Sequence, residues 1–222
     1  MDRVNHDVIV EPFSRIEVSG PMRLTLRQHG SHGSCERLHL FVNQDLIPYL
    51  AIESESQTLK LSTTTPVIPT QWISVSSDCP NVVQVKAGEF ADISVSGVTR
   101  ESFRAISNGG YVAVLGRLDR LEADVSAGGL INTERLHVNE ARLRVDGRGY
   151  IFAAQPELYD AQATGTGEIH LFGADHHGDY SQELEMGVYL RAKDYRSGKD
   201  GSVNAKFISF GQVKRRLEQS LK

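Results

Sequence analysis

A short pattern of small polar residues and glycine recurs four times between Glu101 and Gly173, and it constrains the fold more than any other feature. The closing glycines of the four copies lie 19, 20 and 18 residues apart. The copies are Ser107-Asn108-Gly109-Gly110, Ser126-Ala127-Gly128-Gly129, Asp146-Gly147-Arg148-Gly149 and Thr164-Gly165-Thr166-Gly167. A fixed period of this size is typical of a solenoid, in which each repeat buries its apolar face against its neighbours.

Two apolar positions flank every glycine turn. The position before the turn holds, in successive repeats, Ile106, Val125, Val145 and Ala163. The second position after the closing glycine holds Val112, Ile131, Ile151 and Ile169. Serine, threonine and aspartate bond nearby backbone groups, and glycine adopts the positive φ that a tight corner needs. Each repeat is therefore predicted to be a strand, a sharp bend and a strand, with a core-facing residue on each side of the bend.

The length of the repeat selects the type of solenoid. At roughly 3.3 Å per strand residue, a coil of about 20 residues has a path of ~66 Å, enough for two or three short sides. Helical repeats are the competing interpretation, but the turn residues leave too little room in each coil for paired helices. The sequence predicts an all-β fold, a parallel β-helix or β-solenoid, in a domain over residues 1–173 whose regular coils span 101–173.

Residues before the repeat also alternate between apolar and polar. Short strands are predicted at 13–18, 22–26, 38–42 and 59–61, one or two helical turns with Asn43 as N-cap at 43–50, and an earlier, less regular coil around Ala87-Gly88.

Three of these stretches together resemble a known bacterial family. They are Phe13 to Gly20, Leu59-Lys60-Leu61, and the glycine turns that end at Thr164 to Ile169. The family is the putative auto-transporter adhesin, head GIN domain, and the resemblance covers roughly residues 8 to 173. It implies a right-handed β-helix-like fold and an exported, cell-envelope setting. It implies no catalytic residues, and the family's activity is not established.

Residues 174–222 form an extension of the same domain. Alternating apolar residues at 188–192 and 203–207 flank Asp200-Gly201, which predicts a hairpin. From Gln212 onward a short helix is predicted, with Val213, Leu217 and Leu221 on one face. Because the ends of a solenoid expose unpaired strand edges, the hairpin and helix are expected to cap the stack.

Composition limits the partners and the compartment. With a net charge of −4 there is no basic field for nucleic acid, and no apolar run reaches the ~18 residues of a membrane span. Met1 to Asp7 lacks the apolar stretch of a signal peptide. A cytoplasmic chain and an exported chain trimmed after its signal both fit, and the early first strand favours the second, in the periplasm or at the cell surface.

Cys35 and Cys79 each lie beside turn residues and could pair in an oxidising compartment. Their spacing does not fit a metal site. The densest ligand-type clusters are Asp175 to Asp179 and the pair His29 and His32, and both are best interpreted as solvated loops. Lys214-Arg215-Arg216 is interpreted as the solvated face of the terminal helix. No nucleophile motif or phosphate-binding loop is present, so no catalytic residue, metal or cofactor is predicted.

Alternation places two columns of side chains on the outside of the repeats. One column is Tyr111, Leu130, Tyr150 and Glu168, and the other is Ala113, Asn132, Phe152 and His170. Rings in register on a flat sheet can stack on sugars or pack against a protein, although ordinary cross-strand pairing would look the same. The predicted binding residues are Tyr111, Leu130, Tyr150, Phe152 and His170.

Three functions remain open from the sequence. The leading hypothesis is a non-catalytic binding module that offers this face to a glycan or a cell-surface protein. The second is a polysaccharide-active enzyme, which the missing stacked acid pair disfavours. The third is a structural protein that forms homo-oligomers through its open coils.

Overall fold

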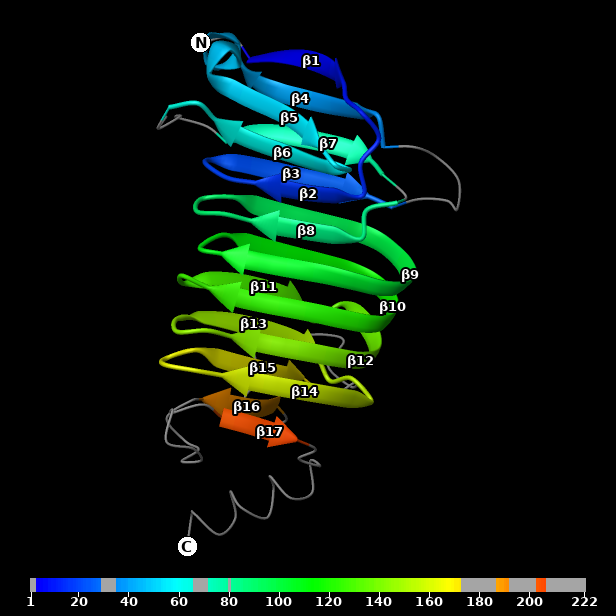
Figure 1. Cartoon of the computed structure of the whole chain (residues 1–222), viewed down its shortest axis with the longest axis vertical. Helices are drawn as coiled ribbons and strands as arrows, with labels where there is room; N and C mark the ends of the chain where they lie inside the picture. The colour runs from blue at the N-terminus through cyan, green and yellow to red at the C-terminus, as the bar shows by residue number, and fades with distance from the viewer. Residues whose placement is uncertain are drawn as a thin grey trace, which may run out of the picture.

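The computed structural model describes residues 3–28, 35–65, 72–79, 81–172, 187–191 and 203–206. These residues form an elongated stack of strands, with the N-terminal strands at one end and the C-terminal strands at the other (Figure 1). The helical element η1 (Gln44–Tyr49) is a short 3-10 helix. The predicted all-β solenoid is confirmed.

The strands follow two long faces that enclose one core. In order along the stack, the first sheet contains β1 (Arg3–Ile9), β4 (Arg37–Asn43), β7 (Ile73–Asp78), β3 (Met22–Arg27), the first parts of β9 (Asp92–Asn108) and β10 (Tyr111–Ser126), β11 (Gly129–Thr133), β13 (Gly149–Ala154), β15 (Glu168–Phe172) and β16 (Gly187–Arg191). The second sheet contains β5 (Leu50–Glu55), β6 (Thr58–Thr63), β2 (Arg15–Val18), β8 (Gln84–Ala87), the second parts of β9 and β10, β12 (Leu136–Val145), β14 (Leu158–Ala163) and β17 (Val203–Lys206).

The regular coils have the predicted period. Val112 pairs with Ile131, Ile131 with Ile151, and Ile151 with Ile169, so each coil is roughly 18–20 residues long. The glycine turns between coils lie along one long edge of the stack, on the left in Figure 1. The predicted apolar column after the turn is confirmed, and it extends into the N-terminal half. Its buried members are Leu40, Val75, Leu24, Ile93, Val112, Ile131, Ile151 and Ile169.

The apolar column before the turn is correct in three repeats and wrong in the first. Val125 pairs with Val145 and Val145 with Ala163, as predicted, but Val125 pairs with Ser107 and not with Ile106. Ser107 is fully buried, whereas Ile106 pairs with Asp124 on the outside. The Ser107 hydroxyl donates to the Gly110 carbonyl at 2.6 Å and accepts from the Leu130 N–H at 3.2 Å. A satisfied hydroxyl therefore replaces an aliphatic side chain at this core position.

The N-terminal half is interleaved in a way that differs from simple coil order. β3 lies between β7 and β9, and β2 lies between β6 and β8, although both β2 and β3 precede β6 in the sequence. Beyond β7 the first sheet ends in the antiparallel strands β4 and β1, and the second sheet ends in the antiparallel strand β5. Strands of successive coils pair in parallel, whereas the strands at this end of the stack pair antiparallel.

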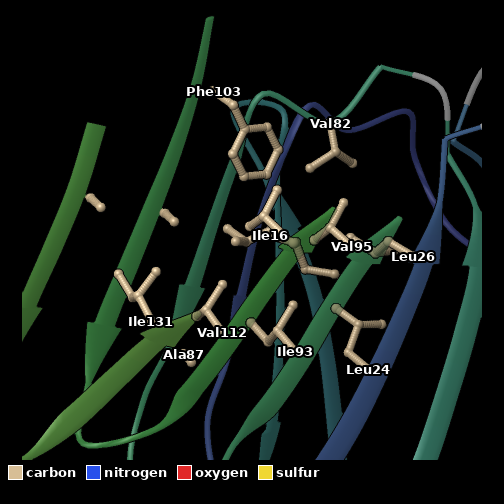
Figure 2. Close-up of a cluster of buried hydrophobic side chains, with 14 of the residues drawn as sticks. Ile16, Leu24, Leu26, Val82, Ala87, Ile93, Val95, Phe103, Val112 and Ile131 are labelled. Carbon is tan, nitrogen blue, oxygen red and sulfur yellow. The ribbon is translucent and has the colours of Figure 1, made fainter. Parts of the chain in front are cut away.

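Side chains from both sheets meet in one core. Ile16, Ala87 and Phe103 come from the second sheet, and Leu24 and Ile93 from the first (Figure 2). All of them are nearly or fully inaccessible to solvent. Packing against both neighbours in a column and against the opposite sheet is the main stabilising contribution in a fold of this shape.

Two further local predictions have outcomes in the described residues. The coil around Ala87-Gly88 is present, because Ala87 pairs with Val18 and Ser107 as part of the same ladder. The helical turns after Asn43 are present as η1, and Asn43 occupies the N-cap position as predicted, although its side chain makes no capping hydrogen bond.

Two strands of the C-terminal extension pair with the last coil. β16 joins β15 and β17 joins β14, both antiparallel. Within the described residues β16 and β17 join different sheets and do not pair with each other, so the prediction that they form a hairpin is wrong. The predicted turn at Asp200-Gly201 and the helix from Gln212 lie outside the described residues. Among the described residues, no helix is long and apolar enough to span a membrane.

Candidate functional site

The outer face of the second sheet carries ladders of alternating charge. One ladder follows the register Lys60, Glu17, Lys86, and another follows the register Arg104, Glu122, Arg142, Asp160. Several neighbours form ion pairs across the strands: Lys86 with Glu17 at 3.2 Å, Arg104 with Glu122 at 3.6 Å and with Asp124 at 2.8 Å, and Arg120 with Glu140 at 3.2 Å.

The charged side chains of these ladders pair with one another across neighbouring strands of the sheet. Exposed pairs of this kind contribute at most about 1 kcal/mol each to stability, but a ligand would have to break them to use either partner. The outer face of the second sheet is therefore a solvated surface with no single-sign field, and it is a poor candidate for a binding site.

The outer face of the first sheet is different in character. In its middle strands one outer column holds only small side chains, and the two predicted outer columns continue at its C-terminal end. Tyr111 pairs with Leu130, Leu130 with Tyr150, and Tyr150 with Glu168. Likewise Ala113 pairs with Asn132, Asn132 with Phe152, and Phe152 with His170. Towards the N-terminal end, the second column continues with Ser94, Thr25 and Ser76, and the first continues with the ion pair of Asp92 and Arg23 and then Ser74.

Four ring side chains gather at the C-terminal end of this face, and we refer to Tyr150, Phe152, His170 and Phe172 as the aromatic patch. Phe152 lies at its centre, with ring centroids 6.3 Å from Tyr150, 4.7 Å from His170 and 6.2 Å from Phe172. The Tyr150 and Phe152 planes differ by only 8°. Parallel strands in register hold these rings side by side on a rigid backbone.

The five predicted binding residues all lie on this face, but they form two groups. Tyr150, Phe152 and His170 belong to the aromatic patch, whereas Tyr111 and Leu130 lie on the preceding strands of the same outer columns. Tyr150 is 40% exposed and the other four are partly buried. Phe172 is the patch residue that the sequence analysis missed. Its position two residues after His170 on the same strand was the available indication.

A carboxylate lies beside the imidazole of the aromatic patch. Glu168 and His170 lie two residues apart on β15, and the Glu168 carboxylate is 3.3 Å from Nε2 of His170. Together they place hydrogen-bonding groups beside the rings, as required to orient a polar ligand on an aromatic surface.

The N-terminal end of the same face has a shallow pocket of about 300 Å³. Its lining includes Asp7, His39, Arg23, Phe41 and Ser76. The Asp7 carboxylate is 2.8 Å from Nδ1 of His39, and Nε of Arg23 donates to Asp92 at 2.9 Å. Ser74 and Ser76 of β7 line it together with longer side chains from the neighbouring strands.

The spacing of acids on this face bears on catalysis. Asp92 and Glu168 belong to the same outer column and are four strands apart, a separation of ~19 Å at about 4.8 Å per strand. Glycoside cleavage needs two carboxyl groups about 5–9.5 Å apart. This column therefore does not place its two acids for that reaction.

The remaining candidates from the sequence have varied outcomes. His29, His32, Asp175 to Asp179 and Lys214 to Arg216 lie outside the described residues. Within the residues that the structure describes, no three histidine, cysteine or acidic side chains come together to hold a metal ion. Cys35 and Cys79 are both buried free thiols.

The sequence matches the protein family described as "Putative auto-transporter adhesin, head GIN domain" over residues 12–174. No curated protein matches it. Several solved structures have a similar fold. A putative adhesin from Parabacteroides distasonis has 19% identity and a TM-score of 0.59, with 78% of this chain and 74% of that chain covered.

Two further structures extend this comparison. A putative adhesin from Bacteroides fragilis has 16% identity and a TM-score of 0.57, with 79% and 90% of the two chains covered. A putative adhesin from Parabacteroides merdae has 18% identity and a TM-score of 0.53, with 77% and 81% covered. Identities this low show a common fold and do not identify a ligand.

Proposed function

Because this chain belongs to the family described as "Putative auto-transporter adhesin, head GIN domain", we propose that it is a non-catalytic binding module of the bacterial cell envelope that holds a glycan on the outer face of its first sheet. The aromatic patch is the observation that carries the proposal. It combines ring faces with a carboxylate and an imidazole on a rigid parallel ladder. The paired charges of the opposite face argue against a site there.

The chemistry of the patch suits a sugar ring. The apolar C–H face of a sugar can lie on an aromatic face, while its hydroxyl groups bond to Glu168 and His170 at the border. A flat protein partner would also bury aromatic side chains, but it would need a larger contiguous apolar area than this mixed aromatic and small polar surface offers.

Substituting the most exposed ring tests the proposal. Tyr150→Ala is expected to weaken glycan binding about tenfold or more, because it removes an anchor ring from the patch. Leu158→Ala is the matched control, since Leu158 is 50% exposed on the second sheet and its loss should leave binding unchanged. The measurement is a glycan array followed by titration calorimetry with the best binder.

The glycans that bind on the array also distinguish a binding module from an enzyme. Binding without new reducing ends supports a binding module, whereas release of reducing sugar would replace it with a polysaccharide-active enzyme. Equal loss of affinity in Tyr150→Ala and Leu158→Ala would mean that the aromatic patch is not the site. Capture of a surface protein with no glycan bound would change the ligand class.

We also propose that the coils wind in the right-handed sense and that residues 174–222 cap the stack. Right-handed crossovers between parallel strands of one sheet are by far the commoner sense. The pairing of β16 with β15 and of β17 with β14 supports the cap, because these strands cover the two edges that the last coil would otherwise expose.

Removal of residues 174–222 should therefore expose the edges of β14 and β15. We expect the shortened chain to associate through these edges, with a lower melting temperature and an apparent mass in light scattering that grows with concentration. An equally stable and equally monomeric shortened chain would count against the cap.

A further inference from the structure

Cys35 and Cys79 are brought together by the pairing of β4 with β7. These strands are antiparallel, with His39 opposite Ser76 and Leu40 opposite Val75. Just before β4 the alternation of buried and exposed residues is interrupted, because Glu36 and Arg37 are both exposed, and Cys35 and Cys79 both face the core. Directly opposite Cα atoms in an antiparallel pair lie about 4.5–5.5 Å apart and a disulfide spans about 4.4–6.8 Å, so an offset of one residue remains within reach.

The two side chains meet in the core. Cys35 is 1% exposed and Cys79 is 0% exposed, and their thiols are hydrogen-bonded to each other. The Ser77 hydroxyl lies 3.2 Å from Sγ of Cys79 and donates to the Arg37 carbonyl at 2.6 Å. Both sulfur atoms are therefore held in fixed positions on adjacent segments of chain.

The surroundings make the two thiols unequal. The hydrogen bond from Cys79 is the main reason that the pKa of Cys35 falls below its usual value, and the positive charge of Arg100 acts in the same direction. The hydrogen bond to Cys35 and the effect of burial raise the pKa of Cys79. Cys35 is thus the thiol that ionises first and can act as the nucleophile.

We propose that Cys35 and Cys79 form an intramolecular disulfide when the chain encounters a disulfide oxidant. The Cys35 thiolate attacks a sulfur of the oxidant, and a mixed disulfide forms as the first leaving thiolate departs. Cys79 then loses its proton and attacks the Cys35 sulfur, releasing the second thiolate. The oxidant gains two electrons, the two cysteines lose two electrons and two protons, and the S–S bond is the only new bond that remains in the protein.

The location gives this bond a structural role. The segment between the two cysteines contains β4, η1, β5, β6 and β7, which make up most of the antiparallel end of the stack. Joining the ends of this segment restricts the unfolded chain and holds β4 and β7 in register. The bond would therefore stabilise the end of the solenoid that is opposite the C-terminal extension (Figure 1).

Oxidative refolding of the full chain tests the proposal without requiring an oxidant to enter the folded core. The unfolded, reduced chain is refolded in a buffer of reduced and oxidised glutathione, denatured, and treated with iodoacetamide. We expect no alkylated cysteine in the monomer and a Cys35–Cys79 cross-linked peptide in a non-reducing digest. The oxidised monomer should melt about 10 °C above the reduced one, given the length of the closed loop.

The double variant Cys35→Ser/Cys79→Ser is the control, and its melting temperature should not respond to the reductant. If this variant does not fold, the wild-type chain with and without reductant still decides the question. Two alkylated thiols after equilibration, glutathione on each cysteine, or disulfide-linked dimers as the main product would each overturn the proposal.

Discussion

Gly110→Ala is expected to lower the free energy of unfolding by about 3 kcal/mol, the upper part of the range for overpacking, because the new methyl group has no space. A Cβ at this position would meet the carbonyl oxygen of Gly88, and it would lie 2.8 Å from both the Ala91 carbonyl oxygen and the Ala87 Cβ. Most of these are backbone atoms of the preceding coil. They cannot retreat, because the Tyr111 N–H bonds to the Ala91 carbonyl at 2.8 Å and fixes the spacing of the coils.

Gly147→Ala provides the matched control on the same edge of the stack. Its Cβ would meet nothing within 4 Å, so the cost is limited to the backbone strain of alanine at a φ of +78°, about 1 kcal/mol. Urea unfolding followed by circular dichroism measures both variants. If Gly110→Ala and Gly147→Ala lose similar amounts of unfolding free energy, then the turn conformation, and not the close approach of the coils, explains why glycine is needed at Gly110.

The glycine turns and the apolar columns beside them show how far a repeat can be predicted from its sequence. The closing glycines and the aliphatic residues after them follow a nearly constant period, so their stacking was predictable. Ile106 was misplaced because the first turn is one residue shorter: Val112 follows Ser107 by five positions, whereas Ile131 follows Val125 by six. A register shift between Val114 and Gly116 makes up the difference. Hydrophobicity alone does not reveal a bulge.

The N-terminal half was predictable only as a set of strands. Alternation correctly located β2, β3, β4 and β6, because each has one buried face. The insertion of β3 between β7 and β9 was not predictable, since these partners lie roughly 50 to 70 residues further along the chain. Local patterns specify which face of a strand is buried, but not which neighbour pairs with it.

For the candidate site, the sequence predicted the two outer columns but not the contacts between their side chains. Once the period was known, the outer columns followed from alternation, and the pairing of Tyr150 with Leu130 and Glu168 is as predicted. Only the structure shows that the rings concentrate around Phe152, and that opposite charges pair across the other face. Both features depend on side-chain contacts between coils, which the period does not determine.

Ile93→Ala should also cost about 3–4 kcal/mol of unfolding free energy, because it leaves a cavity in the middle of the core. Ile93 is fully buried, and its column neighbours are Leu24 and Val112 (Figure 2). Ser94→Ala is the control on the same strand, since Ser94 points to the outer face and its loss should change stability by less than about 0.5 kcal/mol. Urea unfolding of both variants gives the comparison.

Ile151→Ala removes the same atoms from the same column, three strands further along the stack and wholly within the regular coils. It therefore tests whether the position of Ile93 is special. In a stack with only nearest-neighbour contacts, the two substitutions should cost about the same. However, Ile93 lies where the interleaved strand β3 meets the first regular coil, so its cavity weakens one of the two buried column contacts between β3 and β9, the other being Leu26 with Val95. We therefore expect Ile93→Ala to broaden the unfolding transition by separating the two halves, and Ile151→Ala to leave it sharp. Equally sharp transitions would mean that the interleaved half and the coils unfold as one unit regardless of this contact.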